Sequence, residues 1–94
     1  KMLEREPKWR DLKSNTEKIR YIYRMSILKY LKKGYTYKSY MTPTEVERDI
    51  EKWQGEQENE ILEEIVPAYN RARYGQAHIE DVEVEILYNL YRDS

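Results

Sequence analysis

The stretch SNTEKIRYIYRMSILKYLKKG, residues 14–34, decides the predicted fold. Ser14 followed three residues later by Glu17 is a capping box, which satisfies two backbone donors at the start of a helix. Apolar side chains then recur every three or four residues in two adjacent stripes, and Gly34 suits the left-handed conformation that often ends a helix. A helix with two apolar stripes is buried on more than one side, so we expect this helix to be central.

Three further helices are predicted downstream. Thr42-Pro43-Thr44-Glu45 combines a capping box with a proline at the first helical position, so a helix should begin there and extend over residues 43–54. Apolar side chains at helical spacing predict two more helices, over residues 57–74 and 80–92. Pro67 lies inside the first of these and should kink or restart it, because proline removes a backbone hydrogen bond.

Together these elements predict an all-α fold, a small four-helix bundle in which the first helix, over residues 14–33, is central. The helical domain should extend over residues 14–94, and residues 1–13 should be a linker or a short helix that docks through Trp9. The predicted core comprises Ile19, Ile22, Tyr23, Ser26, Tyr30, Val46, Ile50, Trp53, Leu62, Ile65, Tyr69, Ala72, Val82, Ile86 and Leu90.

The composition excludes most kinds of enzyme and metal site. The 94 residues include no cysteine, which excludes disulfides, zinc–thiolate sites and a cysteine nucleophile. His78 is the single histidine of the sequence, so a metal motif with paired histidines is impossible, and we expect His78 to be exposed or to cap a helix. We therefore predict no catalytic residue, no metal site and no cofactor, and we expect that the protein is not an enzyme.

Charge is distributed unevenly along the chain. Residues 1–40 hold twelve basic and four acidic side chains, whereas residues 41–94 hold five basic and fourteen acidic ones. One interpretation is that the two halves form different helices whose surfaces attract each other. The other is that the basic half faces an anionic partner, such as lipid headgroups or nucleic acid.

The predicted interaction surface combines loop tyrosines with basic residues. The tyrosines between the first two helices are the ones for which burial is least expected. The helix that begins at Thr42 is acidic and would repel DNA, which argues against nucleic acid as the partner. The surface comprises Tyr35, Tyr37, Tyr40, Lys29, Lys32, Lys33 and Arg71.

A series of short motifs has a distinctive order. The motifs are Tyr23-Arg24, Gly34, Thr42-Pro43-x-Glu45, Tyr69-x-x-Ala72-Arg73-Tyr74-Gly75 and Glu80-Asp81. Their order and spacing, over roughly Lys18 to Tyr91, resemble the domain-of-unknown-function family 4129. The chain departs from that family at Ile79, where a Ser or Thr cap is common, so the start of the last helix stays open.

The resemblance implies a setting rather than an activity. Members of the family typically lie at the C-terminal, cytoplasmic end of bacterial and archaeal membrane proteins, often ones with a transglutaminase-like domain on the other side. The resemblance therefore implies a non-catalytic cytoplasmic interaction module, with a membrane span upstream of Lys1 and an unknown protein partner. Weak contact between the basic half and anionic lipid is expected. The alternative function is binding of nucleic acid or another anionic ligand through the basic N-terminal half.

Overall fold

The computed structural model describes residues 8–55, 60–74 and 78–93, and these residues form an all-α bundle. A short 3-10 helix precedes the α-helices and carries Trp9. The elements are η2 (Trp9–Asp11), α1 (Asn15–Lys32), α2 (Pro43–Trp53), α3 (Glu60–Arg73) and α4 (Asp81–Asp93). The predicted all-α fold is confirmed.

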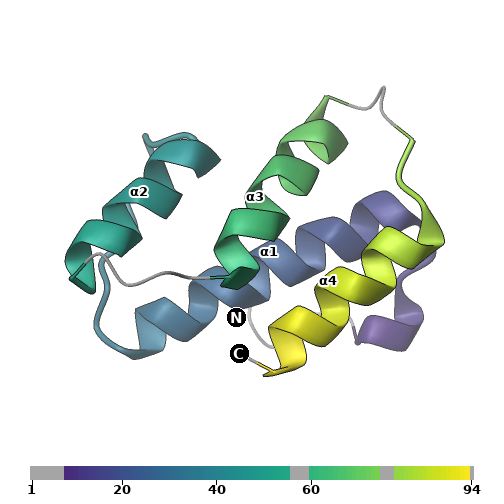
Figure 1. Cartoon of the computed structure of the whole chain (residues 1–94), viewed down its shortest axis with the longest axis horizontal. Coiled ribbons are helices and arrows are strands. Elements are labelled where there is room, and N and C mark those ends of the chain that lie inside the picture. Colours follow the sequence, from purple (N-terminus) through teal and green to yellow (C-terminus); the bar gives the residue numbers. More distant parts are fainter. Residues whose placement is uncertain (1–7, 56–59, 75–77, 94) are drawn as a thin grey trace.

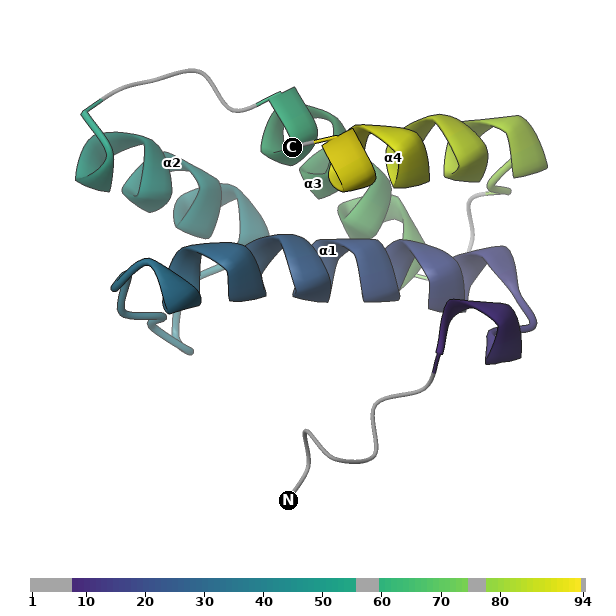
Figure 2. The ribbon, with the colours of Figure 1, turned by 90° about the horizontal axis from the view of Figure 1, so that it is seen from below.

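Helix α1 is the platform of the bundle (Figure 1). Helices α3 and α4 pack on α1 and on each other, and α2 packs against α3. Figure 2 shows α2, α3 and α4 on one side of α1, and η2 lies near the N-terminal end of α1, where Trp9 contacts Tyr21 of α1 and Tyr88 of α4. The central position predicted for the first helix is therefore correct, and one side of α1 is left largely uncovered by the other helices.

Both predicted capping boxes form in the structure. The hydroxyl of Ser14 accepts a hydrogen bond from the backbone N–H of Glu17 at 3.1 Å, and the Glu17 carboxylate accepts one from the Ser14 N–H at 3.3 Å. Thr42 and Glu45 form the same reciprocal pair at the start of α2. Gly34 follows α1 with a φ of 108°, a conformation that side chains with a Cβ rarely adopt.

A side chain of α1 holds the start of α4. The Asn15 side-chain amide donates one hydrogen bond to the Ile79 carbonyl and another to the Asp81 carboxylate, both at 2.8 Å. Ile79 itself is buried in the core. Asn15 thus ties the start of α4 to α1, through a contact between residues 64 positions apart in the sequence.

Of the two outcomes predicted for Pro67, a kink or a restart of the helix, α3 does not show the restart. It extends through Pro67 from Glu60 to Arg73 without a restart, and the proline is exposed on its outer side. Residues 57–59, which were predicted to belong to this helix, lie outside the described residues. Among the residues described, the buried positions of α3 include Leu62, Ile65 and Ala72, as predicted.

An aromatic stack joins α1 to α3 at the centre of the bundle. The rings of Tyr23 and Tyr69 are parallel within 9°, with their centroids 4.0 Å apart. The Arg73 guanidinium lies 5.9 Å from the centroid of the Tyr69 ring, within the range of a cation–π contact. Tyr23 is buried, and Tyr69 is half-buried against the core.

Three predicted core residues are wrong: Trp53, Val82 and Ile86 are exposed. The inward positions of α4 are Val84 and Leu87, with Tyr88 and Tyr91 half-buried beside them. Two overlapping apolar stripes compete in this helix. The stripe that faces inward includes Tyr88, whose ring stacks on Trp9 with the centroids 3.9 Å apart, and an aromatic ring removes more apolar area from water than Val82 would.

Near the end of α2 the ring of Tyr35 is buried, whereas the ring of Trp53 is exposed. Tyr35 is only 4% exposed, and Trp53 lies edge-on against it with the ring centroids 5.6 Å apart. Trp53 thus covers one side of the Tyr35 ring while its own ring remains exposed to solvent.

The Tyr23–Tyr69 stack generates a stability prediction. Tyr69→Ala removes the ring from this contact and from Arg73, so we expect a loss of about 2 kcal/mol in the free energy of unfolding. For a domain of this size, that loss corresponds to a fall of roughly 10 °C in the thermal midpoint. Tyr74→Ala, at an exposed tyrosine, is the control and should leave the midpoint nearly unchanged. An unchanged midpoint for Tyr69→Ala would contradict the packing described for this ring.

The register of α4 can be tested with two neighbouring residues. Leu87→Asn places an amide in the core and should lower the free energy of unfolding by about 3 kcal/mol or more. Ile86→Asn alters an exposed position and should change it by less than about 1 kcal/mol. Urea denaturation followed by circular dichroism measures both. A larger loss for Ile86→Asn than for Leu87→Asn would show that the predicted stripe, not the observed one, faces the core.

Candidate functional site

The three loop tyrosines of the predicted interaction surface have different environments. Tyr35 is buried, whereas Tyr37 is exposed and Tyr40 is 80% exposed. The buried one makes a hydrogen bond: the Tyr35 hydroxyl donates to the Asp49 carboxylate at 2.7 Å. Tyr35 therefore fastens the loop to α2, and Tyr37 and Tyr40 are the tyrosines that this loop presents to solvent.

Asp49 is the anchor of this loop. Besides the Tyr35 hydroxyl, its carboxylate accepts a hydrogen bond from the Lys38 ammonium group at 2.8 Å. The hydrogen bonds from Lys38 and Tyr35 lower the pKa of Asp49. Burial and the hydrogen bond to Asp49 raise the pKa of Tyr35. The group stays in the form of tyrosine hydroxyl, ionised carboxylate and ammonium at neutral pH, which suits an anchor and not proton transfer.

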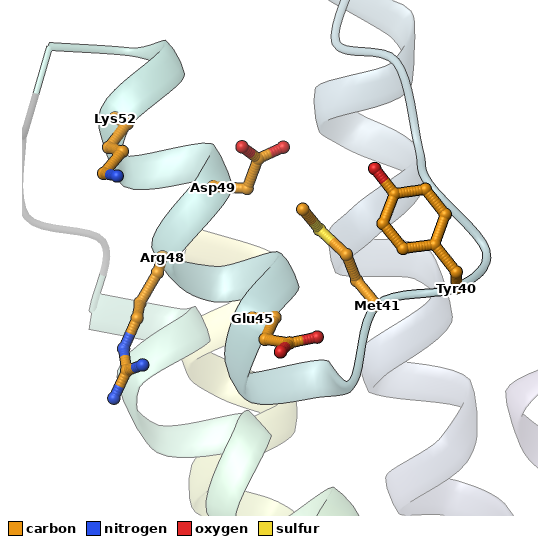
Figure 3. A pocket seen from close by; sticks show the side chains of 6 residues that line it. All are labelled: Tyr40, Met41, Glu45, Arg48, Asp49 and Lys52. Atoms are coloured by element: carbon orange, nitrogen blue, oxygen red, sulfur yellow. The ribbon is translucent and has the colours of Figure 1, made fainter.

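A shallow cavity of about 420 Å³ lies between this loop and α2 (Figure 3). Figure 3 shows the carboxylates of Glu45 and Asp49 on the side of α2 that faces Met41 and Tyr40, whereas Arg48 and Lys52 extend from the other side of the helix. The Glu45 carboxylate accepts the backbone N–H of Thr42 at 2.9 Å. Both acids of the cavity thus hold the loop and the helix start together.

The predicted lysines lie around a second cavity, near the C-terminal end of α1. Lys29, Lys32 and Lys33 line it, and its volume is about 310 Å³. Lys29 also has a structural role, because its ammonium group donates a hydrogen bond to the Tyr91 carbonyl at 2.7 Å and so joins α1 to the end of α4. Burial, followed by repulsion from Lys33, lowers the pKa of Lys29.

Arg71 lies apart from the loop and the lysines. It forms an ion pair with Glu83, which links α3 to α4. His78 is exposed, as expected, with its Nε2 3.4 Å from the Glu80 carboxylate. The seven predicted surface residues therefore divide among three places: the loop beside α2, the cavity at the end of α1, and the α3–α4 pair.

Sequence reasoning missed two features of the surface. Val82 and Ile86 lie one turn apart on the outward side of α4 and are 61% and 56% exposed. The second feature is the hydroxyl of Ser26, which is fully buried and has no hydrogen-bond partner. Ser26 was expected in the core, but sequence periodicity carries no information about whether a hydroxyl there finds an acceptor.

The described residues offer no evident metal centre. Over residues 8–55, 60–74 and 78–93, no group of three or more His, Asp or Glu side chains is placed to hold a metal ion. Glu47 of α2 lies near Glu51 and Glu63, and burial together with repulsion from these two carboxylates raises its pKa. Like charges of α2 and α3 therefore lie near each other at this place.

No family model, curated protein or solved structure matches this chain significantly. The resemblance to the domain-of-unknown-function family 4129 therefore remains a prediction.

The raised pKa of Glu47 generates a pH-dependent prediction. The folded state binds the Glu47 proton more tightly than the unfolded state, so this group favours folding at low pH and loses that contribution as pH rises through its raised pKa. Glu47→Gln should therefore raise the free energy of unfolding at pH 7, by about 0.5 kcal/mol because the site is partly screened by solvent. Below about pH 4 the difference from wild type should vanish.

Thermal unfolding of both proteins across this pH range measures the effect. Glu64→Gln, at an exposed position of α3, is the matched control. A Glu47→Gln variant less stable than wild type at pH 7 would show that the carboxylate makes a favourable contact instead.

Proposed function

We propose that this chain is a non-catalytic interaction module on the cytoplasmic side of a prokaryotic membrane protein that carries a transglutaminase-like domain elsewhere. The supporting observation is that a mainly basic helix, α1, is covered on one side by three helices that together are mainly acidic. The module would present its basic side to the membrane and its acidic side to a protein partner. No helix in the described part of the chain is long and apolar enough to cross a membrane.

The charge separation follows the arrangement of the helices. Helix α1 carries five basic residues and one acidic residue, whereas α2, α3 and α4 together carry eleven acidic and five basic residues. Because these three helices lie on one side of α1 (Figure 2), the uneven charge along the sequence becomes an uneven charge across the molecule.

The side chains on the uncovered side of α1 suit contact with a lipid surface. Arg20 and Arg24 are exposed on α1, where they line a shallow cavity of about 200 Å³ with Tyr21. Leu28 and Leu31 follow at the next turns, half-buried and exposed respectively. Arginine side chains beside one half-buried and one exposed leucine allow charge contact with anionic headgroups and slight insertion of apolar groups.

The outward face of α4 suits contact with a protein partner. Val82 and Ile86 are exposed on the outward face of α4, a helix with four acidic residues and one basic residue. By charge complementarity, this face fits a basic amphipathic segment whose apolar residues cover the two aliphatic side chains.

The alternative function, binding of an anionic ligand by the basic half, is favoured by a different observation. Three lysines surround the cavity at the C-terminal end of α1. That cavity lies on the face of α1 that carries Ser26 and Tyr30, both of which are buried, and not on the face of Arg20 and Arg24.

Vesicle co-sedimentation tests the membrane-facing side. The protein should bind anionic vesicles weakly, lose that binding as salt is raised, and not bind neutral vesicles. Arg20→Glu/Arg24→Glu should weaken binding at least tenfold, because each basic residue contributes about 1 kcal/mol near an anionic surface. Lys29 is unsuitable for substitution, since it joins α1 to α4.

The matched control reverses two charges on α2. Arg48→Glu/Lys52→Glu alters net charge equally, at exposed positions that do not belong to α1, and should bind vesicles nearly as wild type does. Equal losses in both variants, or no binding of wild type at low salt, would refute the proposed orientation.

A further inference from the structure

Residues 8–13, which we call the strap, lie against the bundle through one aromatic ring. The Trp9 ring stacks on Tyr88 of α4, with the centroids 3.9 Å apart and the planes within 11° of each other. The same ring lies 5.6 Å from the ring of Tyr21 of α1, and the Lys18 ammonium group lies 5.7 Å from its centroid. Trp9 is nevertheless only half-buried, and η2 has no buried residue. The docking of the strap therefore depends on the contacts of a single side chain.

The backbone hydrogen bonds of the strap are local. The N–H groups of Asp11 and Leu12 donate to carbonyl groups within the strap, at 2.8 and 3.1 Å. At the end of the strap, the Lys13 N–H donates to the Glu17 carboxylate at 2.9 Å. All three bonds can persist when Trp9 leaves its stack, so the ring can undock without unfolding of the helices.

The strap has the composition of a segment that lies in a membrane interface. Its basic residues are all exposed: Lys8, Arg10 and Lys13. Its apolar residues are Trp9 and Leu12, and an indole ring is favoured at the boundary between headgroups and acyl chains. Basic residues next to this ring are attracted to anionic headgroups. Asp11 of the strap and Glu17 of the neighbouring cap oppose this attraction, so the basic residues outnumber the acidic ones by one.

The strap adjoins the side of α1 for which lipid contact is proposed. Leu12 lines the same shallow cavity as Arg20 and Arg24. Tyr21 also lines this cavity and contacts the Trp9 ring. Lipid that reaches the two arginines would therefore lie close to the docked ring.

We propose that the strap is a second membrane contact: when the uncovered side of α1 lies on an anionic membrane, Trp9 leaves its stack on Tyr88 and enters the lipid interface. The proposal rests on the lipid contact proposed above for Arg20 and Arg24. It adds an exchange of one ring between two environments, the aromatic stack in the bundle and the interface of the membrane. Because the stack competes with lipid for the ring, a weaker stack should strengthen membrane binding.

Tryptophan fluorescence tests where the ring lies. Trp53→Phe leaves Trp9 as the single tryptophan of the chain. On vesicles of phosphatidylglycerol and phosphatidylcholine with brominated acyl chains, we expect about half or more of the Trp9 emission to be quenched at low salt. Neutral brominated vesicles should leave it unchanged. Trp9→Phe is the matched control, and its remaining Trp53 should keep its emission on the same vesicles, because α2 lies on the covered side of α1 (Figure 2).

Affinity for the same anionic vesicles tests the competition. Trp9→Ala should weaken binding about fivefold or more, because no ring enters the interface. Tyr88→Ala should tighten binding about threefold or more, because it removes the stack that holds Trp9 in the bundle. The double variant Trp9→Ala/Tyr88→Ala should lose this gain. A gain that persists in the double variant would come from loosening of the bundle and would overturn the proposal.

The outcomes separate the strap from the function on which it rests. Unquenched Trp9 in protein that is bound to anionic vesicles would overturn the strap proposal and leave the lipid contact of α1 in place. Unchanged or weaker vesicle binding by Tyr88→Ala would overturn it as well. If the Trp53→Phe protein binds no anionic vesicles at low salt, the proposed membrane orientation is refuted, and the strap proposal with it.

Discussion

The burial of one side of α1 beneath α3 and α4 is the constraint on which the rest of the structure depends. Ile19 and Ile22 are completely buried there, and the stacked rings of Tyr23 and Tyr69 continue the contact between α1 and α3. Asn15, at the start of α1, holds the start of α4 by two hydrogen bonds. These contacts place residues far apart in the sequence side by side, so the same helix supplies the core and orients the elements that cover it.

The one-sided cover of α1 also determines the charge of the surface. A helix that is packed on one side must expose its opposite side, and on α1 that side carries Arg20 and Arg24. The acidic residues of the chain lie mainly on the helices that cover α1. The uneven charge of the surface therefore follows from the order of basic and acidic segments and from the packing of the later helices on α1.

Several polar groups of the described bundle make structural hydrogen bonds. Asp49 holds Tyr35 and Lys38, Glu45 closes the start of α2, and Lys29 joins α1 to α4. Ser26 is the exception among the buried side chains described, since its hydroxyl makes no hydrogen bond.

The local signals of this sequence determined its helices, whereas only tertiary packing decided which faces are buried. Capping boxes and Gly34 act within a few residues, so helix starts and the end of α1 could be predicted. In α4 two apolar stripes overlap, and Trp9, from the other end of the chain, selected the stripe of Tyr88 by stacking on it. The same holds for Ser26. Its burial could be predicted from the helical period, but the hydrogen-bond partners of its hydroxyl depend on tertiary contacts, which no local pattern encodes.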